Sequence, residues 1–329
     1  MRVPLSVLSL ASVTSEQTIS AALQNATEVA QAVERFGYKR FWIAEHHNIP
    51  GVASSATAVL IGHIAELTSK IRVGSGGIML PNHAPLIVAE NFGTLATLYP
   101  GRIDLGLGRA PGTDPLTTRA LRRDLKSTGN EFPELVQELL AYFEPRKPGQ
   151  RVQAIPGAGV NVPIWILGSS LFSAHMAAQM GLPYSFAAHF APTELENALE
   201  IYRRGFTPSP YLSKPLTMAC LPVIAAPSDD EAKFLATSTQ QKILGLIGGN
   251  RPPSSPAPVK SMDDIWTPIQ KAGVDNFLRE LIVGGPETVR AGLEAFQKRT
   301  HVDEIMIHTD MYLKDLIIRS FEIVANVWK

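Results

Sequence analysis

Two adjacent histidines, His46 and His47, follow a short apolar segment that has the composition of a buried strand. Neutral imidazole titrates near physiological pH, so a histidine beside a reacting group can transfer a proton. Side chains alternate along an extended chain, which places Trp42, Ala44 and His46 on one side and Glu45 on the other. At most one histidine of the pair then faces the same way as Ala44, and alternation indicates that it is His46.

Glutamate and histidine are also good metal ligands, so a metal site around Glu45 is a rival interpretation. The two adjacent histidines, however, point apart in an extended chain, and no second group of His, Cys or Asp has metal-ligand spacing in the sequence. We therefore expect no metal. A purely structural role for the histidine pair remains open from this segment alone.

Arg109 ends a glycine-rich run that contains Gly106 and Gly108. A guanidinium offers paired donors that suit a phosphate or a carboxylate, although a surface salt bridge would also explain an arginine here. The G-x-G pattern suggests a dinucleotide-binding turn. The next glycine, however, is Gly112, four residues after Gly108 and directly after a proline, and no helical pattern begins there. We expect no independent NAD(P)H site.

Three serines, Ser169, Ser170 and Ser173, stand where an apolar strand-like segment gives way to a helical pattern. The free amides at a helix N-terminus attract anions, and hydroxyls one turn apart can add hydrogen bonds to the same anion. Helix capping would account for one serine, but less readily for three. This segment therefore predicts an anion site.

Three glycines surround Ser75, at Gly74, Gly76 and Gly77, near the end of another strand-like run. Glycine weakens a strand and is useful where a ligand or another backbone approaches closely, although a plain strand-to-loop transition is the alternative. Together the glycine strand, the arginine, the serines and the histidine fit one ligand. A phosphorylated planar cofactor such as FMN would meet all these demands.

The elements that must position these residues alternate between strands and helices, which favours a parallel sheet. Eight strands are predicted, at Pro4–Leu10, Arg40–Glu45, Ile71–Gly77, Arg102–Leu107, Pro163–Leu167, Tyr184–Ala188, Leu216–Ile224 and Glu304–His308. Helical patterns between them include Thr18–Phe36, Ser55–Thr68, Pro85–Tyr99, Phe132–Phe143, Ser170–Met180 and Pro192–Arg204. Eight such units predict an α/β fold, a (β/α)8 TIM barrel with loop insertions that forms one domain over residues 1–329. An open doubly wound sheet is the alternative.

Composition limits the partners. Lysine plus arginine and aspartate plus glutamate are equal, at 30 each in 329 residues, which gives no broad basic surface for nucleic acid or an anionic membrane. The one cysteine, Cys220, lies in an apolar run, which predicts that its side chain packs in the core. We find no signal peptide and no membrane span, and expect a cytoplasmic protein. The Gly-, Pro- and Ser-rich segment Gly248–Val259 predicts a loop, either a lid or an inert surface insertion.

Read in order, these segments resemble the bacterial luciferase-like monooxygenase family over nearly the whole chain, and each motif alone is modest. The motifs that carry the resemblance are F-W-I-A-E-H-H (41–47), G-S-G-G-I-M-L-P-N-H (74–83), P-G-R-I-D-L-G-L-G-R-A-P-G (100–112) and W-I-L-G-S-S (165–170), with G-L-P-Y (181–184) following. The resemblance is closer to single-component-type members with E-H-H-N than to luciferase itself.

The resemblance implies that His46 is the catalytic histidine that assists proton transfer near the flavin. It implies that the cofactor is bound by Ser75, Gly76, Arg109, Ser169, Ser170 and Ser173. A non-prolyl cis peptide is expected at Ser75-Gly76, beneath the flavin ring.

The resemblance further implies an FMN-dependent oxidoreductase. We expect a monooxygenase that inserts oxygen from O2 into a small organic substrate, with reduced FMN (FMNH2) supplied by a partner flavin reductase. A homodimer is expected from the family habit and from the apolar helices Ser55–Thr68 and Pro85–Tyr99.

Two other functions stay open: a flavin- or deazaflavin-dependent reductase or dehydrogenase, and a flavin-binding protein without turnover that serves as storage. Gly108 stands where luciferase has a cysteine, so light emission is not carried over.

Overall fold

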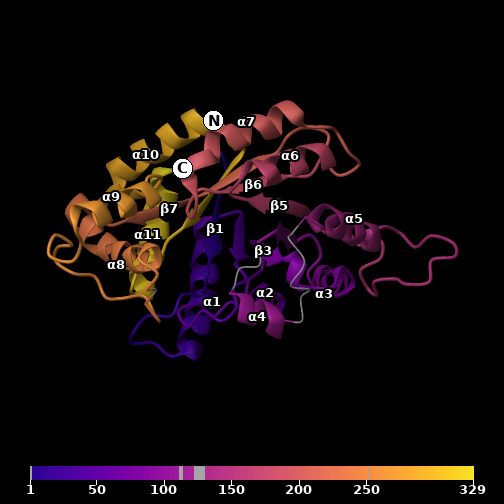
Figure 1. Cartoon of the computed structure of the whole chain (residues 1–329), viewed down its shortest axis with the longest axis horizontal. Helices are drawn as coiled ribbons and strands as arrows, with labels where there is room; N and C mark the ends of the chain where they lie inside the picture. Colours follow the sequence, from indigo (N-terminus) through magenta and orange to yellow (C-terminus); the bar gives the residue numbers. More distant parts are fainter. Residues whose placement is uncertain (1, 111–113, 122–129, 251) are drawn as a thin grey trace.

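Eight parallel strands close into a barrel, as the sequence predicted (Figure 1). The structure, a computed structural model, describes residues 2–110, 114–121, 130–250 and 252–329. The barrel strands are β1 (Leu5–Ser9), β2 (Arg40–Ile43), β3 (Arg72–Met79), β4 (Ile103–Gly108), β5 (Ile164–Gly168), β6 (Tyr184–Ala187), β7 (Thr217–Ala225) and β9 (Glu304–His308). They pair in chain order from β1 to β7, and β9 closes the ring between β7 and β1.

A further short strand, β8 (Ile282–Gly284), pairs with the end of β7 outside the ring. Residues Val223–Ala225 of β7 extend beyond their pairing with β9 and accept β8 as a neighbour. Three residues are too few to show a period of two, so the sequence did not predict this strand.

Helices surround the strands in Figure 1. They are α1 (Ile19–Phe36), α2 (Thr57–Glu66), α3 (Pro85–Leu98), α4 (Pro115–Ala120), α5 (Phe132–Phe143), α6 (Leu171–Met180), α7 (Leu195–Gly205), α8 (Asp229–Ile247), α9 (Pro268–Phe277), α10 (Pro286–Thr300) and α11 (Lys314–Val327), with 3-10 turns at Leu80–Asn82 and Pro192–Glu194. Among the described residues, no helix is both long and apolar enough to cross a bilayer.

Local signals explain where these helices begin and end. The Thr18 side chain accepts a hydrogen bond from the Ala21 amide and caps α1. Gly37 and Gly181 follow α1 and α6 with φ of 88° and 62°, the left-handed conformation that stops a helix at little cost for glycine. The helical patterns predicted from the sequence, Thr18–Phe36 and Ser170–Met180, end at the residues before these glycines.

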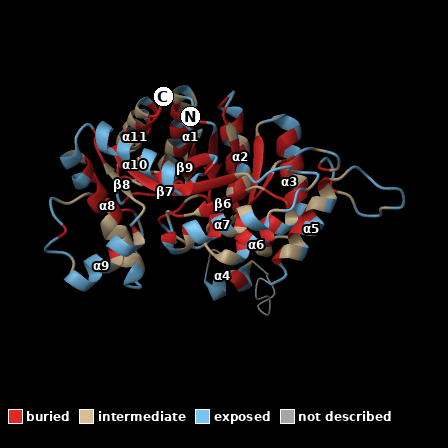
Figure 2. Ribbon diagram, turned by 90° about the horizontal axis from the view of Figure 1, so that it is seen from above, coloured by how far each residue is buried: buried red, intermediate tan, exposed pale blue. Residues whose placement is uncertain are grey.

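Two apolar layers enclose the barrel wall. Outward-facing strand side chains such as Phe41 and Ile43 join the large core beneath the helices. Inward-facing ones form a separate cluster of Leu8, Trp42, Ala44, Trp165, Met218, Cys220 and Met306. Figure 2 shows this burial along the strands and on the helix faces turned toward them. The alternation predicted for 41–44 is therefore confirmed, and Cys220 lies in the core as expected.

A polar layer fills the barrel interior at the N-terminal ends of the strands. Arg40 donates to Asp104 at 2.7 Å and to Glu304 at 2.8 Å, and both carboxylates are almost fully buried. Burial alone would lower the pKa of Arg40, but Asp104 and Glu304 outweigh burial and raise it. In barrels of this type the N-terminal ends serve stability, and the C-terminal ends carry the active site.

The segment Gly248–Val259, of which Arg251 lies outside the described residues, packs against two neighbours. Ser238 and Gln241 of α8 donate to the carbonyls of Pro256 and Ala257. Ser255 exchanges backbone hydrogen bonds with Val13 and Ser15 in the loop after β1. The segment therefore borders the C-terminal end of the barrel, and the choice between lid and inert insertion stays untested.

Candidate active site

The residues singled out from the sequence follow the C-terminal ends of different barrel strands, so the closed barrel gathers them at one mouth. His46 comes after β2, Arg109 directly after β4, and Ser169 and Ser170 directly after β5. Pro111 and Gly112, which end the arginine motif, lie outside the described residues.

Arg109 lies against the first turn of α6. Its guanidinium carbon is 4.3 Å from the centre of the Phe172 ring. Within the described ranges no carboxylate lies in salt-bridge distance of Arg109, so its charge is available to a ligand. Ser170 is the N-cap residue of α6, yet its side chain makes no capping hydrogen bond. The positive side chain of Arg109 therefore lies beside the first amides of α6, and the Ser170 hydroxyl makes no capping hydrogen bond to them. This arrangement is typical of an anion site.

Ser173 occupies a more interior position than Ser169 and Ser170. It is 4% exposed, and its hydroxyl donates to the Ser170 carbonyl at 2.9 Å and lies 3.3 Å from the Tyr184 hydroxyl. A Cβ at Gly168 would stand 1.9 Å from this hydroxyl oxygen. Glycine at 168 thus lets the end of β5 pack closely on Ser173, and Ser173 fixes the first turn of α6.

Ser75 connects two barrel strands. Its hydroxyl donates to the Gly106 carbonyl at 2.8 Å and accepts from the Gly106 amide at 3.0 Å, and the residue is fully buried. Gly77 is equally confined, since a Cβ there would lie 2.7 Å from the Gly106 oxygen. The glycines of β3 thus allow close approach of β4.

The cis peptide expected at Ser75-Gly76 is wrong by one residue, because the bond lies at Gly76-Gly77. Ser75 keeps its regular pairing with Leu105 and its hydrogen bonds to Gly106. The register between β3 and β4 shifts only after Ser75, and the irregular backbone falls between two residues that both lack a Cβ.

Two further histidines, which the sequence analysis did not select, lie at the same mouth as His46. His308 ends β9 and His189 follows β6, and their rings are 5.5 Å apart. Burial, His308 and His46 together lower the pKa of His189 to about 3, so it stays neutral at working pH. His189 therefore adds a neutral imidazole to the mouth. Their position at strand C-termini was the signal that could have found them.

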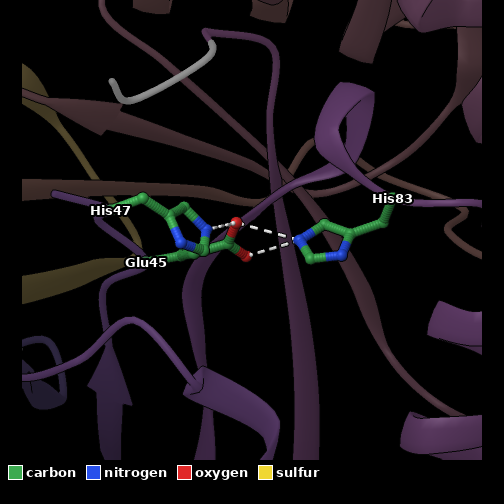
Figure 3. Close-up of side chains that lie close together, drawn as sticks. All are labelled: Glu45, His47 and His83. Carbon is green, nitrogen blue, oxygen red and sulfur yellow. Dashed lines mark hydrogen bonds and ion pairs between the residues drawn. The ribbon is translucent and has the colours of Figure 1, made fainter. Parts of the chain in front are cut away.

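Two histidines, His47 and His83, contact the carboxylate of Glu45 (Figure 3). His47 Nε2 lies 2.9 Å from Glu45 Oε1, and His83 Nε2 lies 2.9 Å and 3.1 Å from the two carboxylate oxygens. The Met79 amide donates to Glu45 Oε2 at 3.3 Å. Burial raises the pKa of Glu45, but the hydrogen bonds from His83 and His47 outweigh it and lower that pKa below its usual value.

Comparison with known proteins covers almost the whole chain. The luciferase-like monooxygenase family matches residues 3–303. The Bacillus subtilis (strain 168) protein YvbT is 56% identical over 326 residues, 99% of this chain and 96% of the relative. A luciferase-like monooxygenase of Escherichia coli (strain K12) is 46% identical over 322 residues, 98% of this chain and 96% of the relative. The crystal structure of apo-MsnO8 superposes with a TM-score of 0.89 at 33% identity, over 99% of this chain and 98% of that one. The chain belongs to the luciferase-like monooxygenase family and is a monooxygenase enzyme.

Proposed function

We propose that this protein binds FMN at the barrel mouth and uses FMNH2 from a partner flavin reductase to insert one atom of O2 into a small organic substrate. The observation that carries the proposal is Arg109, which has no carboxylate partner among the described residues and stands beside the uncapped N-terminus of α6. The residues present thus fit a phosphorylated cofactor. A related fold, the oxygenating part of 3,6-diketocamphane monooxygenase, is known in complex with FMN, at 16% identity and a TM-score of 0.71.

Each group in the site has a task that its chemistry allows. Arg109 and the serines at 169 and 170 hold the phosphate, and Ser173 keeps their helix turn in shape. The bound reduced flavin supplies the electrons that activate O2. His46 moves a proton at its imidazole nitrogen, and the apolar interior below it, with Trp42 and Ala44, keeps water out.

A deazaflavin-dependent dehydrogenase is the second candidate, because an F420-dependent secondary alcohol dehydrogenase shares the fold at 17% identity and a TM-score of 0.69. The substrate class follows neither from the fold nor from the site. A relative from Bacillus subtilis (strain 168), N-acetyl-S-alkylcysteine monooxygenase, is 39% identical over 212 residues, 61% of each chain. S-alkylated cysteine derivatives are therefore the first compounds to test. The cytoplasmic location expected from the sequence stays a prediction.

The decisive experiment compares two electron sources. When the FMN-loaded protein is mixed with NADH or NADPH without oxygen, we expect flavin reduction no faster than that of free FMN. The reason is that Gly106 and Gly108 lie within strand β4, and the next helix among the described residues, α4, begins only at Pro115. Addition of an NADH:flavin reductase should start substrate-dependent O2 uptake, with label from 18O2 in the product.

Rapid flavin bleaching by NADH alone would contradict the two-component mechanism. Turnover with reduced F420 but without incorporated oxygen would support the dehydrogenase instead. Retained FMN with no turnover under any of these conditions would leave a flavin-storage role.

Substitution of Arg109 tests the phosphate site. Arg109→Ala should weaken FMN binding about ten- to a hundredfold, because it removes a charge-assisted contact worth about 1.5–3 kcal/mol. Riboflavin, which lacks the phosphate, should bind nearly as before. Fluorescence titration of both ligands gives the comparison, and an equal loss for both would place Arg109 away from the phosphate.

The homodimer remains a proposal, supported by apolar side chains that α2 and α3 leave exposed. Val59, Leu98 and Ile87 are 75%, 63% and 49% exposed. Light scattering should give about twice the chain mass of 35.7 kDa, and Val59→Glu with Leu98→Glu should give a monomer. Ile269→Glu, at an 85% exposed position of α9, which lies at the left of Figure 1 away from α2 and α3, is the matched control. A monomeric wild-type chain would refute the dimer.

A further inference from the structure

The cluster of Glu45, His47 and His83 has no assigned role in the proposed flavin chemistry. One ligand atom from each residue lies within 4.8 Å of the others, and the three come from two loops, one after β2 and one after β3 (Figure 3). The sequence argued against a metal because the adjacent histidines point apart. The fold meets that objection with a histidine that is distant in the sequence. His47 contacts Glu45, and His83 contacts the same carboxylate from the loop after β3.

The charge of the cluster is the second observation. The Glu45 carboxylate is 1% exposed, and in the described parts of the chain its ion-pair partners are His47 and His83 alone. Both histidines carry charge only when protonated, and among the described residues no lysine or arginine pairs with this buried carboxylate. A buried charge in proteins is normally paired or bound to a metal, and a divalent cation would supply the missing positive charge.

The donor set selects the kind of ion. Two imidazole nitrogens and one carboxylate oxygen suit zinc and neighbouring transition metals, whereas calcium and magnesium prefer oxygen ligands. Bonds of about 2.0–2.2 Å place tetrahedral ligand atoms roughly 3.3 Å apart, so modest side-chain movement would admit the ion. The side chains of His47 and His83 are 16% and 30% exposed, which leaves a path for entry and for water as a fourth ligand.

We propose that Glu45, His47 and His83 form a binding site for one divalent transition-metal ion of the Zn²⁺ type. The ion would replace the hydrogen bonds by which the histidines now hold the carboxylate. It would join the loop after β2 to the loop after β3.

The test uses the full-length protein, stripped with a chelator and then equilibrated with ZnCl2 at pH 7.5. We expect one zinc per chain by atomic emission, a rise in Tm with zinc, and, with CoCl2, the visible bands of a four-coordinate ion. His83→Gln and His47→Gln should each weaken zinc binding by more than about a hundredfold, since even outer-shell partners of a metal are worth ten- to a hundredfold. Binding should also weaken at pH 5.5, where protons compete for the imidazole nitrogens.

The matched control is His175→Gln, which removes an exposed histidine of α6 and should leave zinc stoichiometry and affinity unchanged. The proposal is wrong if the wild-type chain takes up no stoichiometric zinc, or if His83→Gln and His47→Gln bind it as the wild type does. Circular dichroism checks that each variant folds, and the wild-type stoichiometry decides the matter even if one does not. None of these readouts depends on FMN or turnover.

Discussion

His46→Ala should lower turnover by about 10²–10⁴-fold, the range over which a positioned acid–base group contributes. Strand β2 ends at Ile43, and Trp42 and Ala44 point into the barrel interior. His46 follows two residues after Ala44, and it is one of the groups that lower the pKa of His189. FMN affinity should change little, because the phosphate site that we propose lies on the loops after β4 and β5 rather than on the loop after β2.

The measurement pairs steady-state turnover, with the reductase present, with an FMN titration of the same preparation. His175→Ala serves as control because it removes an exposed imidazole that makes no part of the mouth. His46→Gln should be as slow as His46→Ala, since an amide keeps hydrogen bonds but cannot carry the proton at neutral pH. Wild-type turnover in either His46 variant would exclude the proposed proton transfer.

The positions of the barrel strands could be predicted from the sequence because each strand leaves a pattern among neighbouring residues. Short apolar runs bounded by glycine or proline mark strands, and each of the eight predicted strands overlaps a barrel strand to within two residues at either end. Alternation correctly placed Trp42 and Ala44 on one side of the strand, which the structure shows to be the barrel interior. These features depend only on neighbours in the chain.

Contacts between distant segments were not readable in this way. His83 lies 38 residues from Glu45, and the sequence gives no period that connects them. His189 and His308 meet because β6 and β9 both pair with β7, which is a consequence of closure rather than of local pattern. The position predicted for the cis peptide was wrong by one residue because it depends on the register of β3 against β4, which shifts between Ser75 and Ile78.

The polar layer of Arg40, Asp104 and Glu304 also joins distant segments of the chain, at the N-terminal ends of the barrel strands. Arg40→Leu should destabilise the fold by about 3–5 kcal/mol, the cost of breaking a buried ion pair by removing one partner. Arg40 joins β2 to Asp104 on β4 and to Glu304 on β9, and its guanidinium carbon lies 5.0 Å from the centre of the Trp165 ring. Without Arg40, the nearly inaccessible carboxylates of Asp104 and Glu304 both lose an ion-pair partner.

Other cations soften this loss without removing it. Arg72 contacts Asp104 at 2.6 Å and Lys39 contacts Glu304 at 2.9 Å, both from more exposed positions. Urea unfolding at pH 7 measures the effect, and Arg290→Ala, whose ion pair with Glu287 lies at the surface, should change stability by less than about 0.5 kcal/mol.

A compensated variant separates charge from packing. Arg40→Leu combined with Asp104→Asn and Glu304→Gln removes all three charges together, so it should recover much of the lost stability if uncompensated carboxylates are the cause. If this triple variant recovers stability and still binds FMN, the polar layer stabilises the barrel and has no part in ligand binding at its mouth. If Arg40→Leu alone unfolds at the wild-type urea concentration, the layer contributes little and the argument from its burial is wrong.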